Sequence, residues 1–217
     1  MTCPIETYYF KEETMQLPDT KVCIAAMELA RDHSPPFLFN HVMRTFAFGR
    51  AAAALQGTQY DEEMVFLGSV MHDLGLAEKF IRDDRFEIDG ADAAAEFLSQ
   101  QGYSDKKIAV IWDAIALHAT LHVPQRKQPE IALVQLGAGI DVGAIPRSLV
   151  TPETVETILA EYPRLGFKKA FLAAMGAVIR RKPMTGMINL MGDVAREHEH
   201  LHIPSFCDVI NHAEYDE

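Results

Sequence analysis

Cysteine is scarce in this chain of 217 residues, which contains only Cys3, Cys23 and Cys207. These residues are odd in number and far apart, a usage that predicts free thiols in a reducing compartment and not a disulfide framework. The sequence also lacks a Cys-x-x-Cys motif and any close Cys/His pair, so it gives no indication of a structural zinc site.

Positive charge and long apolar runs are also limited. Twenty Lys and Arg residues face 31 Asp and Glu residues, and the net charge of −11 would repel phosphate backbones, so we expect no nucleic-acid partner. The longest apolar run, Ala170 to Ile179, is about half of the roughly 20 residues that cross a bilayer. The segment Met1 to Glu13 is acidic and lacks the pattern of a signal peptide. We therefore expect a cytoplasmic protein with no membrane partner.

Strand-like alternation is nearly absent, and apolar residues recur at helical spacing. A chain of this length can bury a core without disulfides. We therefore predict one all-α domain over residues 1–217, with a core of about 20–145 onto which C-terminal helices within 151–213 pack.

Capping residues, prolines and glycines predict where the helices begin and end. Residues 79–89 are charged and form an expected irregular loop, and small residues at Gly137 and Gly139 suggest close approach of another backbone. The expected helices cover about 20–32, 35–55, 61–75, 90–101, 105–118, 130–142, a segment opening at 151–153, 166–182 and 187–199.

His72 and Asp73 are adjacent at the end of an apolar helical run. An imidazole and a carboxylate there are poorly placed for packing but well placed to hold a divalent metal. Such an ion needs several ligands converging from different elements. His41 and Asp141, on two further predicted helices, complete a candidate set of four ligands.

The order His41, then His72-Asp73, then Asp141 resembles the HD-domain superfamily of metal-dependent hydrolases. Arg44, three residues after the first His, strengthens the likeness, as does Gly75. The resemblance implies an HD-type helical bundle.

At two positions this chain departs from the pattern of the superfamily, and these departures narrow the branch that it resembles. Many phosphohydrolases of this superfamily carry Lys or Arg where this chain has Leu76, and binuclear members carry His where it has Phe86. Both departures weigh against phosphoester chemistry and against a second metal.

Several segments together look like the cyanamide hydratase family, a mononuclear branch of the superfamily. The resemblance implies zinc-assisted addition of water to the C≡N carbon of cyanamide, a small neutral substrate, to give urea; other small nitriles or amides stay open. His/Asp sets also accept iron or manganese in place of zinc. The segments that carry the likeness are Phe39 to His41, Met71 to Leu76, Arg85 to Ala94, Ala114 to His118, Gly139 to Asp141 and Phe206 to Ile210.

Hydration also needs a proton for the nitrile nitrogen. His118 is the first candidate for this acid/base role, with a helix-end or ligand-orienting His as the alternative, and Glu87 is the second, with a solvated carboxylate as the alternative. Phe39, Phe86 and Trp112 could wall a small substrate pocket, although apolar residues at such spacing more often belong to the core.

Two rival functions stay open, together with the oligomeric state, which includes a homo-oligomer. One rival is an HD-type phosphohydrolase acting on a nucleotide or phosphoester. The other is a non-catalytic regulator whose metal only stabilises the fold. His122, four residues after His118, and the alternating His198, His200 and His202 are expected to lie outside the site, in a loop and at a solvated helix end.

Overall fold

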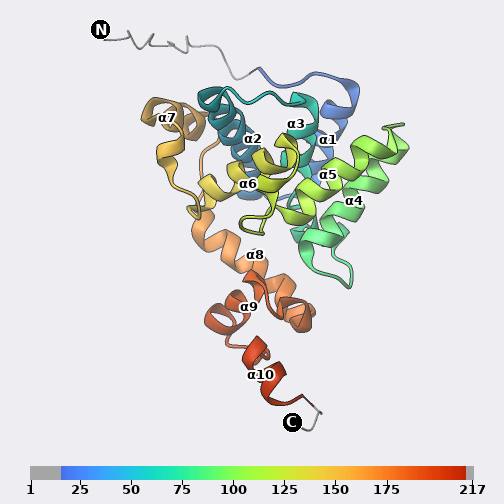
Figure 1. The fold of residues 1–217 in the computed structure, drawn as a ribbon, viewed down its shortest axis with the longest axis vertical. Helices are drawn as coiled ribbons and strands as arrows, with labels where there is room; N and C mark the ends of the chain where they lie inside the picture. Colours follow the sequence, from blue (N-terminus) through green and yellow to red (C-terminus); the bar gives the residue numbers. More distant parts are fainter. Residues whose placement is uncertain (1–15, 214–217) are drawn as a thin grey trace.

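The structure, a computed structural model, describes residues 16–213 and is all-α over that range (Figure 1), which confirms the all-α part of the predicted fold. None of the helices in this range is both long enough and apolar enough to cross a membrane. The expectation about the N-terminal segment lies outside the described residues. The α-helices are α1 (Lys21–His33), α2 (Pro36–Gln56), α3 (Glu62–Met71), α4 (Phe86–Gln100), α5 (Asp105–Leu117), α6 (Pro129–Val142), α7 (Pro152–Glu161), α8 (Phe167–Arg181), α9 (Leu190–Asp193) and α10 (Phe206–Asn211).

Helix starts follow the capping signals in the sequence. The side chains of Thr20, Asp61 and Thr151 each accept a hydrogen bond from a backbone N–H in the first turn of α1, α3 and α7. Proline occupies the first turn of α2, α6 and α7, where its missing N–H costs nothing.

Two helix predictions are wrong at their starts. Helix α4 begins at Phe86 and not at Gly90, because the acidic side chains after Arg85 lie in a first helical turn, where they suit the positive end of the helix dipole. The helix expected over 187–199 begins only at Leu190, where the Asn189 side chain caps it, and changes to a π-helical turn at Val194–His198.

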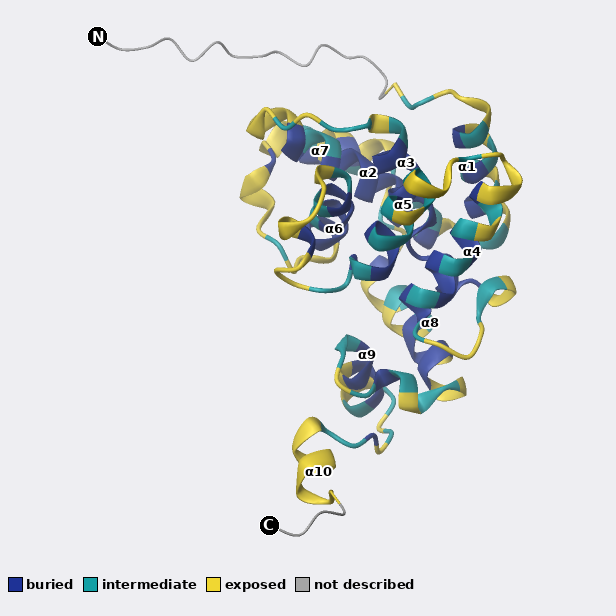
Figure 2. Ribbon diagram, turned by 45° about the vertical axis from the view of Figure 1, so that its right-hand side comes forward, coloured by how far each residue is buried: buried dark blue, intermediate teal, exposed yellow. Residues whose placement is uncertain are grey.

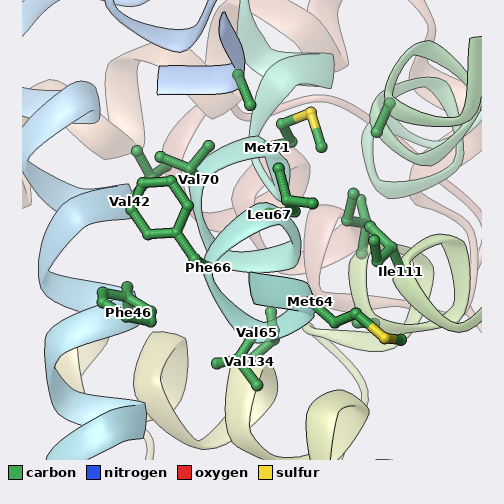
Figure 3. Close-up of a cluster of buried hydrophobic side chains, with 14 of the residues drawn as sticks. Val42, Phe46, Met64, Val65, Phe66, Leu67, Val70, Met71, Ile111 and Val134 are labelled. Atoms are coloured by element: carbon green, nitrogen blue, oxygen red, sulfur yellow. The ribbon is translucent and has the colours of Figure 1, made fainter. Parts of the chain in front are cut away.

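The core surrounds α3. Every residue of α3 from Met64 to Met71 is buried, since α1, α2, α5 and α6 pack around it (Figure 3). Phe66 meets Phe46 of α2 edge-to-face, with ring centroids 5.0 Å apart. A helix buried on all sides places its C-terminal end, and the residues that follow, deep inside the protein.

The C-terminal segment builds a second, smaller apolar cluster against one end of this core. Figure 1 shows α8 leading out of the core towards α9 and α10, and Figure 2 shows that α10 is exposed along its length. The cluster joins side chains of α2, of the 3-10 turn η1 (Leu74–Leu76) and of α4 to side chains of α8 and α9. Its buried members are Leu38, Leu76, Phe86, Met175, Val178, Ile179, Met191, Val194, Ala195 and Ile203.

Helices α2 and α6 cross in close contact at a glycine, as expected for Gly137. A Cβ built on Gly137 would lie 1.9 Å from the carbonyl oxygen of Thr45 and 3.0 Å from the amide nitrogen of Gly49. Gly139 differs from the expectation, because its neighbour is the side chain of Ile145 and not a backbone.

Replacing Gly137 by Ala should therefore lower the stability of the protein by at least ~2 kcal/mol, since two backbones must separate. Gly68→Ala in α3 is the matched control. Its Cβ would meet only side-chain atoms, the nearest being a Val134 methyl at 2.9 Å, and alanine favours the helix. Thermal unfolding of both variants measures the difference; equal melting temperatures would contradict the close crossing.

Candidate metal centre

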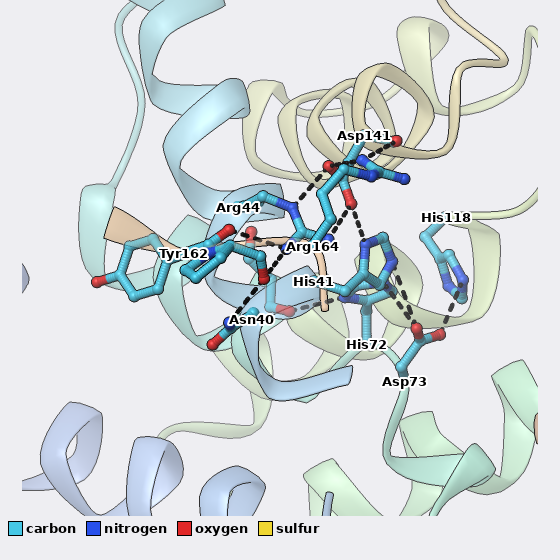
Figure 4. A network of polar contacts seen from close by, with 11 residues as sticks. Asn40, His41, Arg44, His72, Asp73, His118, Asp141, Tyr162 and Arg164 are labelled. Carbon is cyan, nitrogen blue, oxygen red and sulfur yellow. Dashed lines mark hydrogen bonds and ion pairs between the residues drawn. The ribbon is translucent and has the colours of Figure 1, made fainter. Parts of the chain in front are cut away.

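His72 and Asp73 lie in the turn that follows α3. The helix ends at Met71, not at Gly75 as the sequence suggested, and the backbone leaves helical geometry at Asp73 (φ −105°, ψ 15°) before entering η1. Adjacent residues of a continuous helix point roughly 100° apart. The break lets both side chains turn towards His41, which projects from the second turn of α2 (Figure 4).

Three atoms form a nearly equilateral triangle. Nε2 of His41 lies 3.2 Å from Nε2 of His72, and both nitrogens lie 3.4 Å from Oδ2 of Asp73. Ligands of a tetrahedral zinc ion with bonds of ~2.0–2.1 Å are separated by roughly 3.3–3.4 Å. Among residues 16–213, these three side chains form the one group of His, Cys, Asp or Glu close enough to hold an ion.

The hydrogen bonds of the two imidazoles use their Nδ1 atoms and leave their Nε2 atoms, at the triangle, without a donor. Nδ1–H of His72 donates to the carbonyl oxygen of Ser69 (2.7 Å), and Nδ1–H of His41 donates to Oδ2 of Asp141 (2.7 Å). In the neutral rings both Nε2 atoms are then acceptors facing each other. Both oxygens of the buried Asp73 carboxylate also lack a hydrogen-bond partner within the part of the chain that the structure describes. A cation at the centre would satisfy all of these acceptors, so the residues fit a metal ion.

Burial shifts the pKa values of two residues of the triangle. It lowers the pKa of His72 to about 3, with a contribution from the neighbouring His41, and it raises the pKa of the Asp73 carboxyl. Both shifts favour the uncharged side chain.

Asp141 lies on the opposite edge of the His41 ring from the triangle. Besides His41, its carboxylate accepts hydrogen bonds from Nε and Nη2 of Arg44 and from Nη1 of Arg164, each at 2.8 Å. Burial alone would raise the pKa of Asp141, but the hydrogen bonds from His41 and Arg44 hold it well below its usual range. In this geometry Asp141 fixes the ring of His41, and its direct ligation of metal stays a prediction.

His118 follows α5 and faces Asp73 from another side. Its Nδ1–H donates to the carbonyl oxygen of Ile115 (2.7 Å), and its Nε2 lies 3.6 Å from Oδ1 of Asp73. Burial, and then the nearby His72, lower its pKa to about 4. His118 is therefore a neutral imidazole at pH 7 whose Nε2 can accept a proton.

Glu87 is fully buried in the first turn of α4, so the expected alternative of a solvated loop carboxylate is wrong. Its Oε1 accepts a hydrogen bond from Arg85 (2.7 Å), whereas Oε2 has no partner.

Sequence reasoning missed Asp89 and Arg164. Asp89 is buried, accepts hydrogen bonds from the backbone N–H groups of Arg82 and Asp84, and pairs with Lys182. It thereby connects the loop before α4 to the end of α8. The one local signal for Asp89 was an acidic residue in what proves to be the first turn of α4. No local signal pointed to Arg164.

A cavity of about 180 Å³ opens beside the centre. Its wall includes His41, His118 and Phe86 of the sequence-predicted residues. Phe39 and Trp112 lie elsewhere: Phe39 packs on the core under Arg31, and Trp112 donates its indole N–H to Asp92 (2.8 Å). The other lining residues are Ala119, Leu121, Gln135, Ala138, Gly139, Val142, Ala144, Phe171, Met175 and Leu190.

The histidines expected to lie outside the site do so. His122 is in a turn with a left-handed backbone (φ 67°), and His198 lies beside Glu199 at the exposed end of the π-helical turn. We expect His122→Ala to keep bound metal, whereas His72→Ala should lose most of it. Metal analysis of the two purified variants makes the comparison; loss of the ion from His122→Ala alone would contradict the centre described above.

No protein-family model and no curated protein matches this chain. Its function must therefore be inferred from the site.

Proposed function

We propose that this protein is a metal-dependent hydratase of HD architecture that adds water to the C≡N carbon of a small neutral nitrile such as cyanamide. The observation that carries the proposal is the buried triangle of His41 Nε2, His72 Nε2 and Asp73 Oδ2, beside a cavity that His41 also lines.

These three residues would hold one divalent ion, zinc in the first place, with iron or manganese as alternatives. Three protein ligands leave a fourth tetrahedral position open, which is typical of a catalytic zinc site. When bound there, the ion supplies Lewis acidity, which lowers the pKa of water towards ~7. Asp141 and the backbone carbonyl of Ser69 bind the Nδ1–H groups of the two imidazoles, which leaves both Nε2 atoms free to hold such an ion.

His118 is placed to move the proton. His118 lines the cavity, its Nε2 lies 3.6 Å from Oδ1 of Asp73, and its neutral ring can take a proton from the attacking water and deliver it to the nitrile nitrogen. The water oxygen bonds to the nitrile carbon, one proton moves to nitrogen, and the imidic acid tautomerises to the amide, which is urea when the substrate is cyanamide.

The surroundings favour a neutral substrate over a phosphoester. No Lys or Arg is among the residues of the described range 16–213 that line the cavity. Leu76, at the position where many HD phosphohydrolases carry a basic residue, is buried in the second apolar cluster. Lys79 is directed elsewhere, with its Nζ 2.9 Å from Nε2 of His33 on the surface.

The test is metal analysis of protein purified without added metal, paired with assays for urea from cyanamide and for phosphate from a panel of phosphoesters. We expect about one ion per chain and urea release that a chelator abolishes. Phosphate release without urea would favour the phosphohydrolase. Loss of thermal stability on chelation, with neither product formed, would favour the non-catalytic regulator.

A further inference from the structure

From the cavity beside the metal centre we infer that the ligand of this site is larger and more apolar than cyanamide. It is a neutral molecule whose reactive polar end faces His41 and His118 and whose apolar group is about the size of benzene. For a hydratase, that ligand is an aliphatic or aromatic nitrile. The identification of the ligand as a nitrile rests on the proposed function. The inference that the ligand carries an apolar group does not depend on that function.

The polar groups of the cavity mark its reactive end. Nε2 of His41 and Nε2 of His118 both face the carboxylate of Asp73, at 3.4 and 3.6 Å, and both residues also line the cavity. The other polar side chain of the lining, Gln135, already accepts a hydrogen bond from Gln125 (2.5 Å). A polar reacting group therefore belongs beside the two histidines.

Apolar walls begin directly at these two rings. Phe86 meets His118 edge-to-face with centroids 5.7 Å apart, and Phe171 lies against His41 at 5.3 Å. Beyond them, Met175 of α8 and Ala138 of α6 continue the apolar lining. The walls come from both the core and the C-terminal segment, so the cavity exists only where these two parts meet.

The size of the cavity exceeds what cyanamide needs. An apolar cavity of roughly 150 Å³ in another protein binds benzene, and this one has about 180 Å³. Cyanamide is a single carbon between two nitrogens and would leave most of this volume without contacts. Its amino group would also face walls that are mostly apolar, which is unfavourable for a polar group.

The cavity also has an entrance suited to such a ligand. Leu121 and Val142 line it while remaining 56% and 45% exposed, so its mouth reaches solvent between them. A neutral, moderately apolar molecule can enter there without desolvating a charge.

The first experiment compares kcat/KM of the metal-loaded enzyme for acetonitrile, propionitrile, isovaleronitrile, benzonitrile and cyanamide. Each added methylene that the cavity buries should raise kcat/KM about fourfold along the aliphatic series. Benzonitrile should exceed cyanamide by at least tenfold. A flat series with cyanamide as the best substrate would overturn the inference.

A second measurement does not require turnover. The methyl group of Met175, labelled with carbon-13, should change its chemical shift when benzene is titrated into the metal-loaded protein, and Met175→Leu identifies the signal. Saturable benzene binding without hydration of any nitrile would support the apolar cavity and reject the proposed hydratase. Absence of any saturable shift would overturn the cavity inference, whatever the activity.

Two variants and a control locate the effect. Ala138→Phe should fill the cavity, abolish benzene binding and remove the preference for benzonitrile, with bound metal retained. If that variant fails to fold, Met175→Ala, which enlarges the cavity, should shift the preference towards longer nitriles. Ala173→Phe, on the exposed face of α8, is the matched control and should leave both properties unchanged. Unchanged benzene binding in a folded Ala138→Phe protein would contradict the proposed location.

Discussion

Replacing Asp73 by Asn should make the metal-free protein more stable and abolish its stabilisation by zinc. In the wild type, both carboxylate oxygens are buried without a hydrogen-bond donor, and the Nε2 atoms of His41, His72 and His118 face them as further acceptors. An amide of the same shape removes the charge, and its NH2 group in the place of Oδ2 can donate to Nε2 of His41 and of His72. Relief of such unsatisfied groups contributes ~1–3 kcal/mol.

Zinc should stabilise the wild type much more than Asp73→Asn. An ion that binds only the folded state stabilises it by about 4 kcal/mol at a thousandfold excess over Kd. The wild type should gain this increment, whereas Asp73→Asn should gain little and should hydrate no nitrile. Thermal unfolding with a chelator and with zinc therefore gives melting temperatures whose order reverses.

The control is Asp193→Asn, which removes a highly exposed carboxylate whose ion pair with Arg196 contributes little. It should follow the wild type under both conditions. If Asp73→Asn were less stable than the wild type without metal and equally stabilised by zinc, Asp73 would be an ordinary structural carboxylate and the proposed centre would be wrong.

Asp141 should give the second large effect, and its two variants should differ. Asp141→Ala leaves the fully buried guanidinium of Arg44 without its carboxylate partner, although Arg44 still donates to the carbonyl oxygen of Tyr162. Removing one partner of a buried ion pair costs about 3–5 kcal/mol. We expect the Ala variant to unfold at a much lower temperature and to lose bound metal and activity as a consequence.

Asp141→Asn distinguishes between the two roles considered for this residue, which are positioning of the His41 ring and direct ligation of the metal. The amide oxygen can still accept the hydrogen bond from His41, so a residue that positions the ring should leave one ion per chain with affinity lowered about 10–100-fold. A direct ligand should instead show loss of the ion at concentrations that saturate the wild type. Metal titration followed by spectroscopy of a cobalt-substituted protein distinguishes the outcomes, because a changed ligand set changes the d–d bands.

The elements of this protein could be predicted from sequence because their signals are local. Helical spacing, the caps at Thr20, Asp61 and Thr151, and prolines in the first turns all act within a few residues. The same local information places His72 and Asp73 together at the end of a buried helix, and their chemistry already indicates a metal.

Only the tertiary structure decided which role each of the predicted residues takes in the site. Asp141 lies 97 residues from Arg44, and whether its carboxylate faces an ion or the far edge of the His41 ring depends on how α2 and α6 pack. Phe86 likewise lines the cavity because side chains of α8 pack against it. Trp112 lies outside the cavity, where its indole pairs with Asp92. Contacts between segments so distant in sequence produce no periodic pattern in the sequence. They form only when the helices pack against one another through their apolar faces.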